Sequence, residues 1–256
     1  GSSVGRSRFE VKEATYSSSR LPQAFDGYRI VQLSDIHIGS WIGNASAIER
    51  MVELVNAQQP DLIVFTGDLV NHRAVELDGF QEILARLKAK DGVYSILGTH
   101  DYGPYFRWKS KQEQDENLID LKQRQAAMGW KLLNNSHTFL VQGNDSIALI
   151  GVENEGEPPF SQHGDLTGAK AGTEGMFQSD TLETGSTSRI GRGPNAGRTY
   201  PCHATSIRRL LSFRLYLSRM EWNVPGRYTR FVCQRRNRLC RIAFPFRRMA
   251  GNNGAY

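Results

Sequence analysis

The sequence lacks several features by which a function is often recognised. No stretch approaches the roughly 20 consecutive apolar residues that a membrane-spanning helix needs, and no apolar segment of a secretory signal is present. There is neither a glycine-rich phosphate loop nor a G-x-S-x-G element, which argues against a P-loop nucleotide-binding protein and a serine hydrolase. The chain as given is therefore expected to be soluble, and its chemistry must come from other residues.

Cysteine and lysine are unevenly distributed along the chain. The three cysteines among 256 residues lack the spacing of a zinc site, and all of them follow residue 178. Residues 179–256 contain 15 arginines, no lysine and three acidic residues, whereas residues 1–178 contain 17 lysines and arginines and 23 acidic residues. The net charge of +6 therefore comes entirely from the last third of the chain.

Three short apolar runs are each followed directly by residues that carry chemistry. The runs are rich in β-forming residues and bounded by turn residues, which is typical of buried strands: Tyr28–Leu33, Leu62–Phe65 and Val93–Leu97. Stretches with a helical pattern separate them, so the three strands are expected to be parallel neighbours in one sheet. The segments that follow are Asp35-Ile36-His37, Gly67-Asp68 and Gly98-Thr99-His100-Asp101.

Loops at the carboxyl ends of parallel strands share one crevice, which is where α/β proteins usually place their sites. Asp35 and His37 are two residues apart, so on an extended segment both side chains would point the same way. Carboxylate oxygens beside imidazoles suit Mn, Fe, Zn or Mg. The sequence therefore predicts a divalent metal site at this edge of the sheet.

This ordered set of motifs resembles the calcineurin-like metallophosphoesterases, in particular the bacterial type that is often membrane-anchored. The family pattern is D-x-H, then G-D, then G-N-H-[DE], then a lone histidine, and finally G-H-x-H. The resemblance covers roughly residues 25–178, with the first three blocks in order. It implies an α/β fold with a four-layer α/β/β/α sandwich, and hydrolysis of phosphate monoesters or diesters at two divalent metal ions.

The resemblance also implies a role for each motif residue. Asp35 and His37 would bind the first metal, and Asp68 would bridge both metals. His100 would contact the phosphate and the leaving-group oxygen, with Asp101 orienting its ring. Thr99 stands at the asparagine position, where the family has a ligand of the second metal, and a hydroxyl is a weaker ligand than an amide oxygen.

The last two family blocks are missing after Asp101. The remaining histidines, His137, His163 and His203, lie in unrelated contexts. Three of the four ligands of the first metal remain, but only Asp68 of the second set does. At most one weakly held ion is therefore expected, and phosphoesterase activity should be impaired in this chain.

The arginine-rich tail has three interpretations. It could bind nucleic acid or anionic lipid, which would make the chain a non-catalytic binding protein; it could be ordinary solvated surface; or it could be translated out of frame. The third is favoured, because a one-base shift lets Arg198–Ala204 read G-H-T-H-A-M, which contains the missing motif. The same shift makes Ser179–Ser188 and Phe231–Tyr256 resemble the end of the family domain.

These observations predict a frameshift after Gln178. Residues 1–178 would be the N-terminal part of the phosphoesterase domain, and residues 179–256 its out-of-frame remainder, which should pack poorly. The expected partner is a phosphate-ester substrate. No specific nucleic acid is expected, the longer parent protein is expected to be membrane-associated, and the sequence implies no oligomeric state.

The remaining pattern predicts the other elements of the domain. Helices are expected over about 44–56, 77–88 and 113–128, an edge strand over 9–16, strands over 130–133, 138–141 and 146–152, and a loop over 151–170. Four aromatic residues after the third motif either line a substrate pocket or pack against one another, and packing is slightly favoured: Tyr102, Tyr105, Phe106 and Trp108.

Overall fold

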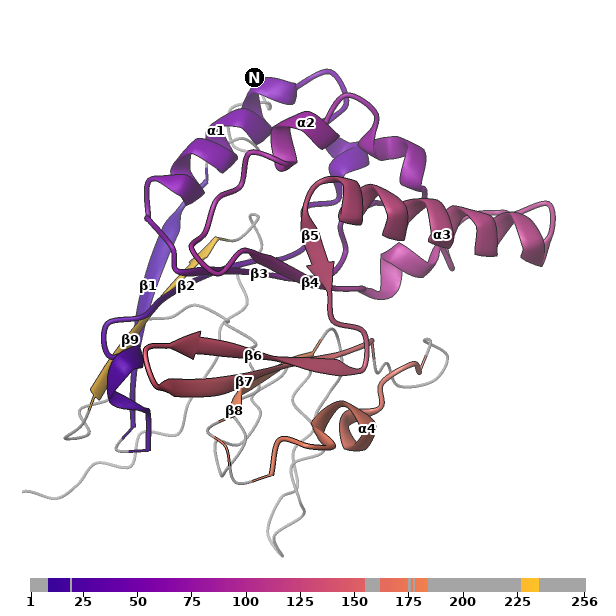
Figure 1. The fold of residues 1–256 in the computed structure, drawn as a ribbon. Helices are drawn as coiled ribbons and strands as arrows, with labels where there is room; N and C mark the ends of the chain where they lie inside the picture. The colour runs from indigo at the N-terminus through magenta and orange to yellow at the C-terminus, as the bar shows by residue number, and fades with distance from the viewer. Residues whose placement is uncertain are drawn as a thin grey trace, which may run out of the picture.

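The computed structural model describes residues 9–18, 20–154, 162–174, 176, 178–183 and 227–234 (Figure 1). These residues form a larger sheet of six strands in the order β1-β9-β2-β3-β4-β5 and a smaller sheet in the order β6-β7-β8. The larger sheet contains β1 Val11–Ser18, β2 Arg29–Leu33, β3 Leu62–Thr66, β4 Val93–Ile96, β5 Trp130–Leu132 and β9 Arg227–Gln234. The smaller sheet contains β6 Ser136–Gln142, β7 Asp145–Val152 and β8 Gln178–Glu183.

The three predicted site-bearing strands are parallel neighbours. β2 pairs in parallel with β3, β3 with β4, and β4 with β5. Every residue of β3 and β4 is buried, as expected for strands covered on both faces. The predicted parallel arrangement is confirmed, and so is the edge position of β1, which pairs antiparallel with β9.

Figure 1 shows four layers: α1, α2 and α3 lie on one side of the larger sheet, the smaller sheet lies on the other, and α4 lies beyond it. Successive residues of a strand point to opposite faces, so Ile63 packs toward the helices while Leu62 and Val64 pack between the sheets. A third apolar cluster joins the smaller sheet to α4 and includes Ile150 and Ala169. The predicted α/β/β/α sandwich is therefore confirmed.

The helices agree with the sequence in two cases and differ in two. α1, Ala45–Asn56, buries the predicted face of Ile48, Met51, Val52 and Val55. α3, Lys111–Ala127, begins two residues earlier than expected, because the Ser110 hydroxyl accepts a hydrogen bond from the Glu113 backbone N–H.

The helix predicted over 77–88 is wrong in length. A 3-10 turn at Ala74–Leu77 is followed by the short α2, Gln81–Leu84. Gly79 has a left-handed φ of 77°, which a continuous helix does not allow. The loop predicted over 151–170 is also wrong at its end, where α4 spans Leu166–Lys170 and the Asp165 side chain caps Gly168.

Two segments near and within the tail form strands. β8 pairs in parallel with β7, and β9 pairs with both β1 and β2. Backbone pairing is open to any segment without proline. The rest of the tail, including Arg198–Ala204, lies outside the described residues, so its out-of-frame origin stays a prediction.

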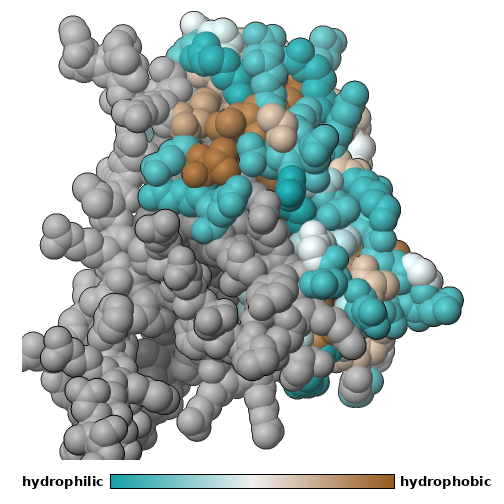
Figure 2. Space-filling view, turned by 90° about the vertical axis from the view of Figure 1, so that its left-hand side faces the viewer, coloured by the Kyte–Doolittle hydropathy of each residue, from teal (hydrophilic) through white to brown (hydrophobic). Residues whose placement is uncertain are grey.

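No helix in the described ranges combines the length and the apolar character that crossing a bilayer requires. On the face drawn in Figure 2, the described surface is mostly hydrophilic, with one small apolar area near its top. Most large apolar side chains of the described residues are instead buried in the three clusters between the layers.

Candidate metal centre

The loops that follow β2 and β3 are joined by backbone hydrogen bonds. The N–H of Asp35 donates to the carbonyl of Gly67 at 3.0 Å, and the N–H of His37 donates to the carbonyl of Asp68 at 3.0 Å. The two loops therefore hold each other at the carboxyl edge of the sheet, where the sequence predicts a site.

The backbone at this edge is strained. Five non-glycine residues of the described chain have a left-handed φ, and three of them are Asp35 at 54°, His37 at 48° and Asp68 at 60°. Each such residue costs about 1–3 kcal/mol, and such residues cluster at functional sites. The expectation of an extended segment from Asp35 to His37 is therefore wrong, because the chain turns at both residues.

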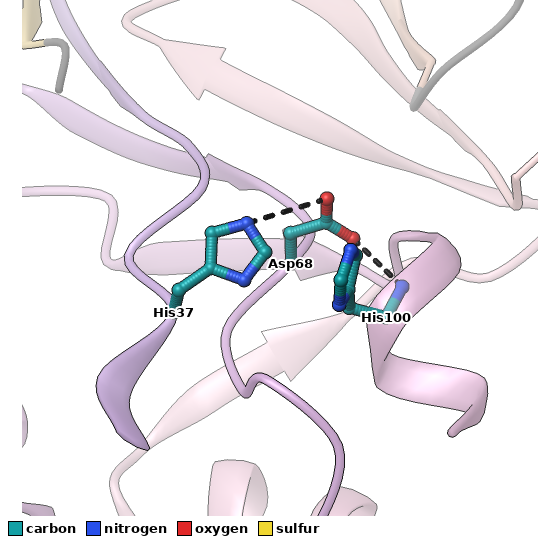
Figure 3. Close-up of side chains that lie close together, drawn as sticks. All are labelled: His37, Asp68 and His100. Atoms are coloured by element: carbon teal, nitrogen blue, oxygen red, sulfur yellow. Dashed lines mark hydrogen bonds and ion pairs between the residues drawn. The ribbon is translucent and has the colours of Figure 1, made fainter. Parts of the chain in front are cut away.

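His37, Asp68 and His100 form a compact cluster (Figure 3). One ligand atom from each residue lies within 4.8 Å of the other two. The Asp68 carboxylate lies close to both residues: its Oδ2 is 3.8 Å from the His37 ring nitrogen Nε2, and its Oδ1 accepts a hydrogen bond of 2.9 Å from the backbone N–H of His100. The three predicted loops thus each contribute one side chain.

Asp35 lies on the solvent side of the cluster. Its Oδ1 is 4.0 Å from His37 Nε2, and 60% of its side chain is exposed, against 21% for His37. The Ser34 hydroxyl donates to its other oxygen. Asp35 is thus close enough to share an ion with His37 after a small side-chain movement.

The buried Asp101 carboxylate joins the loops after β3 and β4. It accepts four backbone hydrogen bonds, from the N–H groups of Asp68 (2.9 Å), Leu69 (2.8 Å), Val70 (3.2 Å) and Gly98 (2.8 Å). Both carboxylate oxygens are used fully by these donors. Asp101 therefore fixes the backbone on which Asp68 stands.

The predicted contact between Asp101 and the His100 ring is wrong. Nδ1 of His100 lies 2.8 Å from the backbone carbonyl oxygen of Asn71. Because a carbonyl only accepts hydrogen bonds, Nδ1 carries a proton and Nε2 is the nitrogen with a free lone pair. Asn71 thus plays the ring-orienting role that the sequence assigns to Asp101.

Two carboxylates at this edge, Asp68 and Asp101, have raised pKa values. Burial raises the pKa of Asp68, and the charge of Asp35 raises it further, against the opposing effect of the His100 N–H and the two imidazoles. Burial and the neighbouring Asp68 likewise raise the pKa of Asp101 to about 7. A divalent cation would relieve this repulsion, so the donor set fits a metal of the Mn, Fe, Zn or Mg type.

Gly98 is required by the close approach of its neighbour. A Cβ at this position would lie 2.3 Å from Asp68 Oδ1 and 2.4 Å from the Asp68 backbone nitrogen. Only glycine therefore fits at this position of the motif.

The next residue, Thr99, does not contact the cluster through its hydroxyl in the described structure. Its Oγ1 donates to Oδ1 of the buried Asn154 at 3.1 Å.

Only one of the four candidate aromatic residues stands beside the cluster. The Tyr105 ring is 49% exposed, and its centroid is 4.6 Å from that of His100. Phe106 and Trp108 pack on each other with centroids 4.7 Å apart, and the buried Tyr102 donates to Glu153. Packing within the loop is confirmed for Phe106 and Trp108, whereas Tyr102 packs against residues outside the loop and Tyr105 alone borders the site.

Sequence reasoning missed Asn71 and Glu76. The carbonyl of Asn71 leaves no trace in the sequence, because every residue has one. The Glu76 carboxylate accepts hydrogen bonds from the N–H groups of Asn71, His72 and Arg73 at 2.6, 3.0 and 3.0 Å, which fixes the position of that carbonyl. An acidic residue three positions into a helical turn, as Glu76 is here, is a capping signal that could have been found.

Comparison with known proteins gives one family. The calcineurin-like phosphoesterases match residues 28–182. A Danio rerio protein described as a transmembrane protein with metallophosphoesterase domain is 33% identical over 147 residues, which are 56% of this chain and 31% of the relative.

Two bacterial relatives match a shorter stretch. The metallophosphoesterase YkuE of Bacillus subtilis is 36% identical over 102 residues, covering 38% of this chain and 34% of the relative. The UDP-2,3-diacylglucosamine pyrophosphatase LpxG of Chlamydia muridarum is 37% identical over 90 residues, covering 34% and 27%. The chain thus spans about a third of the length of the curated relatives it matches.

Proposed function

The chain belongs to the calcineurin-like phosphoesterase family, and we propose that it acts as a metal-dependent hydrolase of phosphate esters at the cluster of His37, Asp68 and His100. The observation that carries this proposal is the convergence of these side chains to within 4.8 Å, from loops that follow three adjacent parallel strands. Such a crevice is where α/β proteins bind their ligands.

The first metal would be held by Asp35, His37 and Asp68. When bound, a divalent ion would polarise the phosphoryl group and offset the charge that develops during hydrolysis. Thr99 stands where a second ion would need an amide ligand, and a hydroxyl is a weak substitute. We therefore propose that the chain binds at most one divalent metal ion, and binds it weakly.

His100 would act on the leaving group. With Nδ1 donating to Asn71, Nε2 is the nitrogen that can take up a proton and deliver it to the leaving oxygen. Asp101 would serve indirectly, because its four backbone hydrogen bonds fix Asp68 and the turn that carries His100.

The substrate class is a phosphomonoester or phosphodiester. The Chlamydia muridarum relative is named as a UDP-2,3-diacylglucosamine pyrophosphatase, which supports a substrate with a large leaving group. The Danio rerio relative is named as a transmembrane protein, which supports a membrane-associated parent for this chain. Turnover by the chain as given would be low, because the family's last two histidine blocks are missing from it.

The function is tested by hydrolysis of bis(p-nitrophenyl) phosphate with added Mn²⁺, before and after chelation. His100→Asn should abolish turnover. His137→Asn is the matched control, because His137 Nδ1 also contacts a backbone carbonyl, that of Ala169 at 3.0 Å, but lies outside the cluster. Turnover that survives both chelator and His100→Asn would refute the proposal.

The predicted loss of activity is tested by comparing this chain with a repaired version of it. A version with the reading frame restored after Gln178 and the histidine segment reinstated should gain metal-dependent turnover. If the tail instead binds nucleic acid or anionic vesicles, that binding should fall steeply with salt and survive Asp68→Ala. Equal turnover by the two versions would remove the case for impairment.

A further inference from the structure

The 3-10 turn η4, Thr99–Tyr102, carries His100 and Asp101, and it is held on a second side by the end of β7. The Thr99 hydroxyl donates to Asn154 Oδ1 at 3.1 Å, and the Tyr102 hydroxyl donates to Glu153 Oε1 at 2.7 Å. Two residues just beyond β7 therefore bind the first and last residues of η4.

Glu153 is surrounded by neutral donors. Besides Tyr102, the side-chain amides of Asn134 and Asn135 donate to it at 2.9 and 2.8 Å. No lysine or arginine of the described chain forms an ion pair with it. A carboxylate accepts hydrogen bonds on both oxygens, whereas a glutamine would accept on one oxygen only and an apolar side chain on none. Because both of its oxygens can accept, the ionised Glu153 carboxylate binds all three donors.

Tyr102, which connects η4 to Glu153, is tightly packed. Its side chain is only 8% exposed, and its ring stacks on His163 with centroids 4.2 Å apart and planes 20° apart. Gln114 of α3 donates to its backbone carbonyl at 2.7 Å. Burial and the bond to Glu153 raise the pKa of Tyr102, so the phenol remains a donor at any pH near neutrality.

We propose that Glu153 is a positioning residue that, through the Tyr102 hydroxyl, holds η4 against Asp68 and so sets the metal affinity of the cluster; this role rests on the proposed function. The mechanical path is short. η4 carries the His100 N–H that binds Asp68 Oδ1, and the Asp101 carboxylate that binds the Asp68 N–H. Freeing the Tyr102 end of η4 lets these two contacts with Asp68 lengthen.

The chain offers a matched control at the opposite end of the sheet. The Tyr28 hydroxyl donates to the carboxylate of Asp91, and Tyr28 is 5% exposed. Tyr28 lies directly before β2, and Asp91 lies two residues before β4, so this bond is remote from η4. Tyr28→Phe therefore removes the same kind of buried tyrosine–carboxylate bond without touching the site.

The test compares Mn²⁺ affinity and thermal midpoint for the full chain and for Tyr102→Phe, Glu153→Leu and Tyr28→Phe. Tyr102→Phe keeps the ring and its stacking, so the fold should persist. The two tyrosine variants should lower the midpoint by similar amounts. Only Tyr102→Phe and Glu153→Leu should weaken Mn²⁺ binding, by about 3- to 10-fold, below the range for direct partners of metal ligands.

Each result has a separate meaning. Unchanged Mn²⁺ affinity in Tyr102→Phe, or an equal loss in Tyr28→Phe, would show that the bond to Glu153 serves stability alone and would overturn the role. A wild-type chain that binds no Mn²⁺ would overturn the proposed function itself, and this positioning role with it.

Discussion

The two ends of the parallel sheet use the same kinds of side chain for different purposes. At the amino end, Asp61 accepts a hydrogen bond of 2.7 Å from the Arg29 N–H, and Asp91 accepts the hydroxyl of Tyr28. At the carboxyl end, an oxygen of Asp35 and one of Asp68 both approach His37 Nε2, at 4.0 and 3.8 Å. The first arrangement satisfies each carboxylate within the fold, whereas the second brings charged oxygens and imidazole nitrogens together.

Backbone conformation further separates the carboxylates of the two ends, although Gln59 near the amino end also has a left-handed φ of 50°. Asp61 and Asp91 have no left-handed φ, whereas Asp35, His37 and Asp68 all do. A residue that only stabilises the fold gains nothing from a strained backbone, which costs about 1–3 kcal/mol per residue. We therefore infer that the strained residues at the carboxyl end lower the stability of the fold but hold the site side chains in position. The difference in role between the carboxylates of the two ends can be tested.

The largest expected effect distinguishes Asp68 from Asp61. Asp68→Asn removes the charge that lies between His37 and His100, so Mn²⁺ binding should be lost. Turnover should fall by more than the ~100-fold that loss of an indirect partner produces. Asp61→Asn should lower the free energy of unfolding by about 1 kcal/mol and leave Mn²⁺ binding intact. Calorimetric titration of both variants measures this, and equal loss of Mn²⁺ binding would contradict the division between the two ends.

Next in size is the stability effect of Asp101. Asp101→Asn replaces two accepting oxygens by one, so two of the four backbone N–H donors lose their partner. The free energy of unfolding should fall by about 2–6 kcal/mol, since each unsatisfied buried donor costs about 1–3 kcal/mol. Asp91→Asn, at the more open amino end, should cost about 1 kcal/mol. Urea denaturation measures both, and similar losses would argue against a special role for Asp101.

A third effect concerns pH. Burial raises the pKa of Asp68 and Asp101, the latter to about 7, so the metal-free cluster holds protons at mildly acid pH that its unfolded carboxylates would release. A raised carboxyl pKa means that these groups stabilise the metal-free fold less as pH rises from about 4 to 7. Mn²⁺ binds Asp68 in its deprotonated form, so its affinity should increase as the pH rises.

The measurement is the shift in thermal midpoint on adding Mn²⁺, which should be small at pH 5 and larger at pH 8. Titrations in buffers with different ionisation enthalpies should show protons released on binding. The Asp91→Asn variant should retain the same pH dependence, because its site lies at the other end of the sheet. A midpoint shift that is constant from pH 5 to pH 8 would contradict the raised pKa values.

The sequence predicts the strands better than the contacts of the site. The apolar runs before Asp35, Asp68 and His100 require burial on both faces, which is why β2, β3 and β4 and their parallel order could be predicted. The helix over 77–88 could not be, because its apolar residues are buried as expected while Gly79 breaks the backbone. Periodicity reports which side chains are buried and not whether the helix is continuous.

The site contacts that the sequence misassigned depend on backbone groups or on distant pairs. The partner of His100 is a main-chain carbonyl, which has no residue-type signature, and this led to the wrong role for Asp101. The bond between Tyr102 and Glu153 joins residues 51 positions apart through the second sheet. Only a packed structure places such groups together, whereas the motif residues cluster because each directly follows a strand.

The smallest expected effect concerns Tyr105, the exposed aromatic residue at the carboxyl end. Its ring contacts His100, and burial together with the Asp68 charge raises the pKa of its phenol. An aromatic leaving group could stack on this ring, a contact worth about 0.5–1.5 kcal/mol. Tyr105→Ala should therefore raise KM for an aryl phosphate ester about 3- to 10-fold and change kcat little, because His100 remains held by Asn71. Ile119→Ala, which removes a side chain of similar exposure from α3, is the control and should change neither constant. A fall in kcat without a rise in KM would instead assign Tyr105 to the orientation of His100, and identical losses for aryl and alkyl esters would exclude stacking.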